Sequence, residues 1–116
     1  MLALVKRLVP LLLEGVHPML EVLRDQLRSS TVTEVSFSGK GFFAEIKVLA
    51  TAKRTEPGDI TGGNAYLELS NTNHGGGCVL FVRDGVLATL EGFTYDECWP
   101  EDTRVLSIAN VEPILS

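Results

Sequence analysis

An Asp-Gly pair between two apolar runs is the sequence feature that most constrains the fold. Arg83-Asp84-Gly85-Val86 separates an apolar run that begins at Val79 from a second apolar-rich run. Such a pair favours a two-residue hairpin, because both central residues of a type I′ turn need positive φ. The continuous apolar stretch 79–82 further suggests burial on both faces of the sheet. We therefore expect an antiparallel hairpin at the centre of the fold.

The length and charge of the chain limit its class. Its 116 residues fit one domain, 1–116, that can bury a core without metal or disulfide staples. Its net charge of −5 argues against sequence-independent binding of nucleic acid or anionic lipid, because both need clustered Lys and Arg. The apolar N-terminus is too short to span a membrane and has no signal-peptide cleavage site. We expect a cytoplasmic protein without a nucleic-acid or membrane partner.

Residues 1–30 have the pattern of helices. Apolar residues recur there at spacings of three and four, which predicts a broad buried face. Pro10 either kinks one helix or begins a second, Gly15 indicates a helix stop, and Pro18 indicates the start of a further helix. The region has more apolar surface than one face requires. Two interpretations stay open: an interface with a partner subunit, as in a homodimer, or packing wholly on the chain's own sheet.

Residues 31–116 are mainly patterned as antiparallel strands. Alternation over 33–37, 42–48 and 65–69 predicts half-buried strands, and 103–109 can supply a last one. The polar segment 51–63, rich in Gly, predicts a mobile loop. Residues 42–54 also fit one face of a helix, so strand and helix both stay open there. We predict an α+β fold, an antiparallel sheet of five to six strands with an N-terminal helical hairpin or kinked helix packed on one face.

The tail from Val79 to Pro100 resembles that of a family of short, uncharacterised bacterial proteins. The shared form, VLF-x-x-DG-x-L-x-x-LEG-[FY]-TY and then WP, stands here as Val79-Leu80-Phe81, Asp84-Gly85, Leu87, Leu90-Glu91-Gly92-Phe93-Thr94-Tyr95 and Trp99-Pro100. The resemblance extends to the helical start and to the Gly41-Phe42-Phe43 segment. It implies a helical part on an antiparallel sheet and no activity, since no catalytic or binding residues carry over. Some such proteins lie near toxin genes as presumed immunity factors.

The same tail combines aromatic and acidic residues. We expect the chain to leave the sheet near Gly92, with its aromatic side chains as buried structural anchors. The functional interpretation is an acidic-aromatic docking surface, because buried aromatics ringed by charge are typical of interface hot spots. Its candidate binding residues are Glu91, Tyr95, Asp96 and Trp99.

One glycine motif supports a different class of function. The run from Gly39 to Ala44 satisfies G-x-G-x-x-A, and Asp59 lies near the place of a ribose-binding acid. This interpretation needs a helix from Phe42 to Arg54, and the chain has no clear later helix for a doubly wound sheet. The alternative function is thus a small-ligand or nucleotide-binding protein that uses the Gly39 to Ala44 turn, with the 51–63 loop as a lid.

No residue set predicts catalysis. His74-Gly75-Gly76-Gly77 matches an oxyanion-hole string, but the chain has no G-x-S-x-G elbow, and a flexible turn explains the glycines equally well. Cys78 and Cys98 favour reduced thiols, although a bridge stays open, and a thiol enzyme is a second alternative. His74, Asp96 and the two cysteines follow no metal-ligand spacing, so we expect neither metal nor cofactor. We predict a small, non-enzymatic bacterial protein that acts through protein contacts, as a homodimer or as an immunity-like partner.

Overall fold

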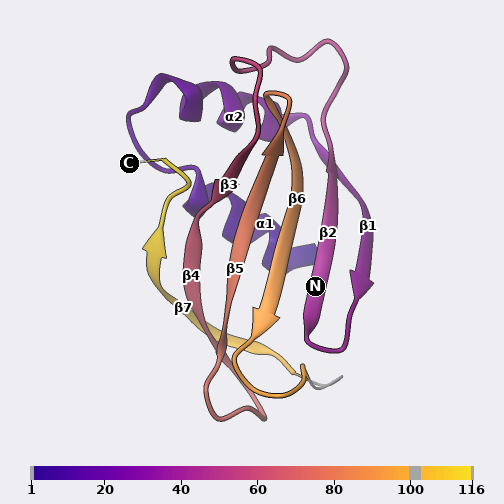
Figure 1. Ribbon diagram of the computed structural model, residues 1–116, viewed down its shortest axis with the longest axis vertical. Coiled ribbons are helices and arrows are strands. Elements are labelled where there is room, and N and C mark those ends of the chain that lie inside the picture. The colour runs from indigo at the N-terminus through magenta and orange to yellow at the C-terminus, as the bar shows by residue number, and fades with distance from the viewer. Residues whose placement is uncertain (1, 100–102, 116) are drawn as a thin grey trace.

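A seven-stranded antiparallel sheet forms one layer of the structure, and two helices form the other (Figure 1). The computed structural model describes residues 2–99 and 103–115. The elements are α1 (Leu2–Leu12), α2 (Pro18–Arg28), β1 (Thr31–Phe37), β2 (Gly41–Lys47), β3 (Ile60–Gly62), β4 (Asn64–Leu69), β5 (Gly76–Arg83), β6 (Val86–Thr94) and β7 (Val105–Glu112). Strand order is β1-β2-β6-β5-β4-β7, with β3 also paired to β5. The predicted α+β fold is confirmed, with seven strands instead of five or six.

The helices begin and end at the residues that the pattern indicates. Pro10 lies inside α1, near its end, and Gly15 follows with a φ of 138° that favours glycine. Pro18 is the first residue of α2, where its missing N–H costs little. His17 is the N-cap, and its Nδ1 accepts a hydrogen bond from the Met19 N–H at 3.1 Å.

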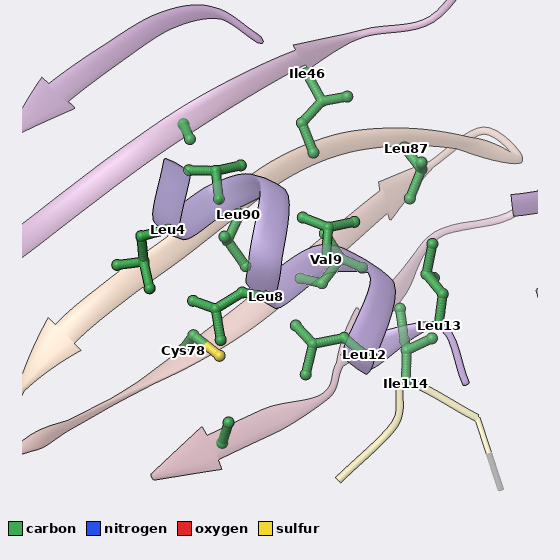
Figure 2. Close-up of a cluster of buried hydrophobic side chains, with 14 of the residues drawn as sticks. Leu4, Leu8, Val9, Leu12, Leu13, Ile46, Cys78, Leu87, Leu90 and Ile114 are labelled. Carbon is green, nitrogen blue, oxygen red and sulfur yellow. The ribbon is translucent and has the colours of Figure 1, made fainter. Parts of the chain in front are cut away.

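The apolar residues of both helices pack on the chain's own sheet. Seven of them are at most 8% exposed, as is Leu13 just after α1: Leu4, Val5, Leu8, Val9, Leu12, Leu20 and Leu23. In Figure 2, α1 lies across the strands, and its Leu4, Leu8, Val9 and Leu12 lie over the strands that carry Cys78, Leu87 and Leu90. The apparent surplus of apolar surface at the N-terminus is therefore used by this chain's core. The burial of these leucines favours the second interpretation, packing on the chain's own sheet.

The central hairpin forms as predicted. Asp84 and Gly85 have φ angles of 51° and 75°, and Arg83 pairs with Val86 across the turn. The expected burial on both faces is wrong, however. Along β5, Leu80 is buried beneath the helices, whereas its neighbours on the opposite face are only half-buried.

Residues 42–54 do not form a helix. Gly41–Lys47 is strand β2, paired with β1 on one side and β6 on the other. Phe42 and Phe43 consequently lie on opposite faces of the sheet, because side chains alternate along a strand. The helix that the G-x-G-x-x-A interpretation requires is absent from this segment.

The predicted loop 51–63 is anchored at several points and contains strand β3. Ile60–Gly62 pairs with β5. Thr55 donates its N–H to Gly85 O at 3.1 Å, and Gly85 donates to Gly58 O at 3.2 Å. The Asp59 carboxylate accepts the Asp84 N–H at 3.0 Å. The segment is thus bound to the hairpin turn and is not a free lid.

Gln26 joins the helical layer to the same turn. Its side chain lies on the buried face of α2, and the residue is only 1% exposed. Nε2 donates to Lys53 O at 3.0 Å and to Gly85 O at 2.9 Å, while Oε1 accepts the Leu87 N–H at 3.0 Å. One amide therefore fixes α2, the anchored loop and the central hairpin relative to one another.

The last strand lies at an edge of the sheet. β7 pairs with β4, so the chain passes from the central strand β6 to the far edge before β7 begins. It spans Val105–Glu112, later than the predicted 103–109. The opposite edge is β1, where Phe37 is 64% exposed.

Candidate functional site

Strand register assigns each side chain of the central strands to one face of the sheet. Phe42 pairs with Gly92 in a row that faces the helices, and Phe42 is fully buried. The adjacent row, Phe43-Glu91-Val79, faces the other way. We call this second side the outer face. In Figure 1 both helices lie behind the sheet, so no helix of the described chain covers the outer face.

The outer face carries most of the aromatic side chains. Five of the seven Phe and Tyr residues lie on it: Phe43, Tyr66, Phe81, Phe93 and Tyr95. Tyr66 is 37% exposed and Tyr95 is 52% exposed, and the three phenylalanines are half-buried. An antiparallel sheet can leave one face in water, but such a face is usually polar. Its aromatic composition makes the outer face the candidate functional surface.

The glycine run before β5 makes room for the two tyrosines. A β-carbon at Gly75 would lie 2.6 Å from the Tyr66 hydroxyl, and one at Gly77 would lie 2.8 Å from the Tyr95 hydroxyl. Tyr95 also packs edge-to-face on Phe93, with ring centroids 5.7 Å apart. Gly75 and Gly77 therefore leave room under the exposed tyrosines, whereas a β-carbon at Gly76 would meet Phe93 O and the Leu69 side chain. The interpretation as a merely flexible turn missed this role.

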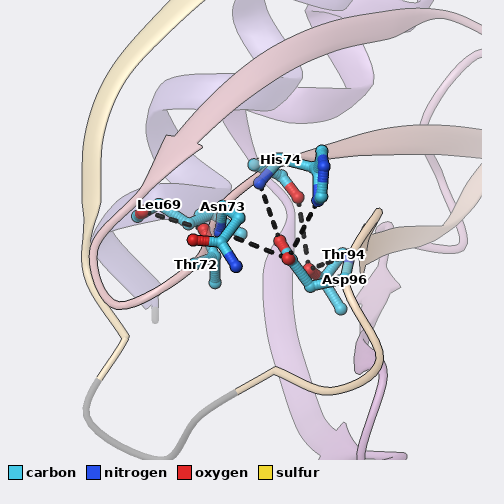
Figure 3. Close-up of polar contacts among 7 residues, drawn as sticks. Leu69, Thr72, Asn73, His74, Thr94 and Asp96 are labelled. Carbon is cyan, nitrogen blue, oxygen red and sulfur yellow. Dashed lines mark hydrogen bonds and ion pairs between the residues drawn. The ribbon is translucent and has the colours of Figure 1, made fainter.

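Asp96 holds the turn that precedes these glycines (Figure 3). Its carboxylate accepts the N–H of Asn73 at 3.2 Å and that of His74 at 2.9 Å, and it lies 3.1 Å from His74 Nδ1. The hydrogen bond from the His74 backbone is the main cause that lowers the pKa of Asp96, followed by burial acting in the opposite sense and by the His74 side chain. Asp96 thus orders the segment below Tyr95.

The four predicted site residues do not form one surface. Glu91 is half-buried on the outer face, Tyr95 is exposed there, and Asp96 supports the turn. The Trp99 ring instead packs edge-to-face on the buried Phe42, with centroids 5.6 Å apart, and the Trp99 backbone N–H donates to Gly39 O at 2.8 Å. Trp99 is an anchor of the core at the end of the sheet. The sequence did not indicate Tyr66, because one tyrosine in an alternating strand has no distinctive pattern.

Packing against the Phe42 ring explains why position 92 is a glycine. A β-carbon there would lie 2.1 Å from Phe42 Cε1. The Phe42 ring thus lies between Gly92 and Trp99. Two separate parts of the tail motif, its Leu-Glu-Gly and its Trp, therefore contact the same ring.

The described residues contain little that could perform catalysis. His74 and Asp96 form a pair, but the hydroxyl beside them, Thr94 Oγ1, already donates to Gly75 O and accepts the Asp96 N–H. Across residues 2–99 and 103–115, no three His, Cys, Asp or Glu side chains gather to hold a metal ion.

The two cysteines, Cys78 and Cys98, are free thiols in different surroundings and do not form a disulfide with each other. Burial raises the pKa of the Cys78 thiol to about 11, only partly offset by the hydrogen bond with the Ala65 backbone, so Cys78 is a poor nucleophile at neutral pH. Cys98 is exposed.

The segments of the ligand-binding alternative lie at opposite ends of the molecule. Gly39 is in the β1–β2 turn beside Trp99, whereas the 51–63 segment lies on the central hairpin turn at the other end of β2 (Figure 1). Seven residues of strand separate them by about 20 Å. They do not build one pocket.

Comparison with known proteins gives no further assignment. Scans against protein-family models, curated proteins and solved structures found no match. In the described part of the chain, no helix is long and apolar enough to cross a membrane.

Proposed function

We propose that the protein is a non-enzymatic interaction module of the bacterial cytoplasm, and that its outer face binds a protein partner. The observation that carries this proposal is the gathering of five aromatic side chains on a sheet face that no helix within residues 2–99 and 103–115 covers. Tyr and Trp are enriched at interfaces because they bury large areas and keep a polar group available. An immunity-like partnership is one form of this role.

The charges on the face favour a basic partner. Around Phe93 and Tyr95, the outer rows of the sheet carry Glu91 and Glu68, and Asp96 lies at the margin. Lys47 and Arg83 lie towards the other end of their strands. Lys40, in the β1–β2 turn, borders the acidic end, because its carbonyl accepts the Thr94 N–H at 2.9 Å. Opposite charges speed association and reject wrong partners. The partner's contact surface is therefore expected to carry Lys or Arg around an apolar centre.

The same charges disfavour a homodimer through this face. A two-fold axis near Phe93 and Tyr95 would bring Glu91 and Glu68 of the two copies together, which costs free energy. A homodimer is a second proposal with a different surface, the free edge of β1, because Phe37 is 64% exposed there. An unpaired edge can add a strand from a second chain. Light scattering on wild type and Phe37→Lys tests it: a dimer that the substitution dissociates supports it, and a monomeric wild type refutes it.

Site-specific photo-crosslinking in the source cells tests the outer face. Benzoylphenylalanine replaces Tyr95 in one variant and the fully exposed Val16 in a control. We expect a crosslinked product from position 95 only, and we expect Glu91→Lys in the same chain to remove it. If the melting temperature shows that the Glu91→Lys protein is folded, the loss of the crosslinked product is due to weaker binding.

Two results refute the outer-face proposal. One is the absence of a crosslink at position 95. The other is a product that forms equally at position 16 or that persists with Glu91→Lys, because neither depends on the acidic-aromatic surface.

A further inference from the structure

A hollow of about 500 Å³ opens on the helical side of the sheet, away from the outer face. It lies where α1, the end of α2 and the first residues of β1 meet. Its ten lining residues are Val5, Lys6, Val9, Pro10, Leu27, Arg28, Ser30, Thr31, Val32 and Ile46. The most buried of them, Val5, Val9 and Ile46, form its floor, and Figure 2 shows Val9 and Ile46 between α1 and the strands. Its size lies within the range of small-molecule sites.

The charge of the hollow is opposite to that of the protein. Two of its lining residues, Lys6 and Arg28, are basic and none is acidic, although the chain has 15 acids against 10 bases. The bases come from different helices, and the apolar side chains lie between them. The hollow therefore combines a hydrocarbon-like interior with a cationic rim.

The end of α2 does not oppose an anion here. Carbonyl groups at a helix C-terminus carry partial negative charge. In this chain Gln26 O accepts the Ser29 N–H, and Leu27 O accepts both the Ser30 N–H and its hydroxyl, the latter at 2.8 Å. These partners satisfy two of the last carbonyls of α2, those of Gln26 and Leu27.

Arg28 already contacts one carboxylate. It pairs with Asp25 at 3.0 Å, and both side chains are largely exposed, so the pair contributes little stability. A guanidinium has five N–H donors and can accept a second carboxylate alongside the first.

We propose that this hollow binds a small amphiphilic carboxylate, with an aliphatic chain of medium length against Val5, Leu27 and Val32 and its carboxylate between Lys6 and Arg28. This inference is independent of the outer-face proposal, because the two surfaces lie on opposite sides of the sheet. A longer fatty acid or an acylated molecule would share this chemistry.

Titration calorimetry with three ten-carbon probes tests the head group. Decanoate should bind with a dissociation constant on the order of 10⁻⁴ M, as expected for a ligand of this size. Decanol and decyltrimethylammonium should bind about tenfold more weakly, because they lack the anion. Equal binding of the three probes, or no binding of decanoate at millimolar concentration, overturns the proposal.

Variants of exposed bases test the rim without disturbing the core. Lys6→Gln and Arg28→Gln should each weaken decanoate binding by about three- to tenfold. Arg7→Gln is the matched control, because Arg7 is the next residue of α1, is exposed and does not line the hollow. If Arg7→Gln weakens binding as much as Lys6→Gln, the rim is not the site.

Amide shifts in NMR spectra locate the ligand. Decanoate should shift Leu27, Thr31 and Val32 and leave Phe93 and Tyr95 unchanged. The reverse pattern would place the ligand on the outer face and refute the hollow as its site, whatever the crosslinking experiment gives.

Discussion

The buried amide of Gln26 predicts a large loss of stability for Gln26→Leu. The substitution keeps a similar volume and removes three hydrogen bonds to main-chain groups. Gly85 O keeps the Thr55 N–H, and Lys53 O lies in an exposed loop where water can replace the amide. The Leu87 N–H, in contrast, is left buried without a partner. Since an unpaired buried group costs roughly 1–3 kcal/mol and each ordinary bond contributes about 1, we expect a loss of about 3 kcal/mol.

Urea unfolding measures this loss. With a slope of about 1.5 kcal/mol per molar urea, the midpoint should fall by about 2 M at an unchanged slope. Asp25→Asn, next to it on the exposed side of α2, is the control and should change stability by less than about 0.5 kcal/mol. A loss below about 1 kcal/mol for Gln26→Leu would contradict the bridging role.

The stability of a Gln26→Glu variant should depend on pH for the same structural reason. At neutral pH the introduced carboxylate faces two carbonyl oxygens in a buried site, which raises its pKa above the ordinary value. A raised native pKa gives stability that is fully present below the unfolded pKa and is lost as pH rises through the native one. The protonated acid can donate to one carbonyl and still accept the Leu87 N–H. We therefore expect this variant to gain stability from pH 7 to pH 4.5 relative to wild type, and a flat difference would refute the explanation.

Two further predictions concern the core. Gly92→Ala should lower the free energy of unfolding, measured with urea, by about 2 kcal/mol or more, because its β-carbon would meet the Phe42 ring. Gly62→Ala is the matched strand control, since its β-carbon would have no contact nearer than 3.5 Å, and it should lower the free energy of unfolding much less. Similar losses for the two variants would contradict the steric explanation. At pH 8 an alkylating reagent should modify one thiol, Cys98, in the native protein and two after unfolding. Because the pKa of Cys78 is raised from 9.0 to about 11, the free energy of unfolding should fall by about 2 kcal/mol more between pH 9 and 11 in wild type than in Cys78→Ala.

Local patterns in the sequence were sufficient to predict the elements of the fold. The Asp84-Gly85 turn has one favoured geometry, and Pro18 after a glycine marks a helix start, so both were predictable from short-range rules. The anchored loop 51–63 was not predictable, because its partners Asp84 and Gly85 lie more than twenty residues away. Gln26 could have been found, since its spacing of three from Leu23 places it on the apolar face.

The candidate site was predicted only in part, because an aromatic residue looks the same in sequence whichever face it occupies. Tyr95 and Trp99 are four residues apart in one acidic tail, yet the first lies on the outer face and the second on the core. What separates them is the turn that Asp96 fixes through His74, a contact across 22 residues. Gly75, Gly76 and Gly77 could have indicated the aromatic surface, although short-range rules predicted only a turn there. Three consecutive glycines at the start of a strand can indicate that large side chains lie over the backbone.

The division of the tail between two faces also supports the proposal that the outer face is functional. Leu90, Gly92 and Trp99 are explained by the core, since each is buried or contacts a buried ring. The core explains the outward positions only in part, since Tyr95 packs on Phe93 and lies over Gly77 yet stays 52% exposed. Glu91 and Tyr95 lie where a sheet needs only water-compatible side chains, and an acid between apolar neighbours gains nothing from the fold. A partner surface that supplies the missing cation and covers the rings would make both residues favourable.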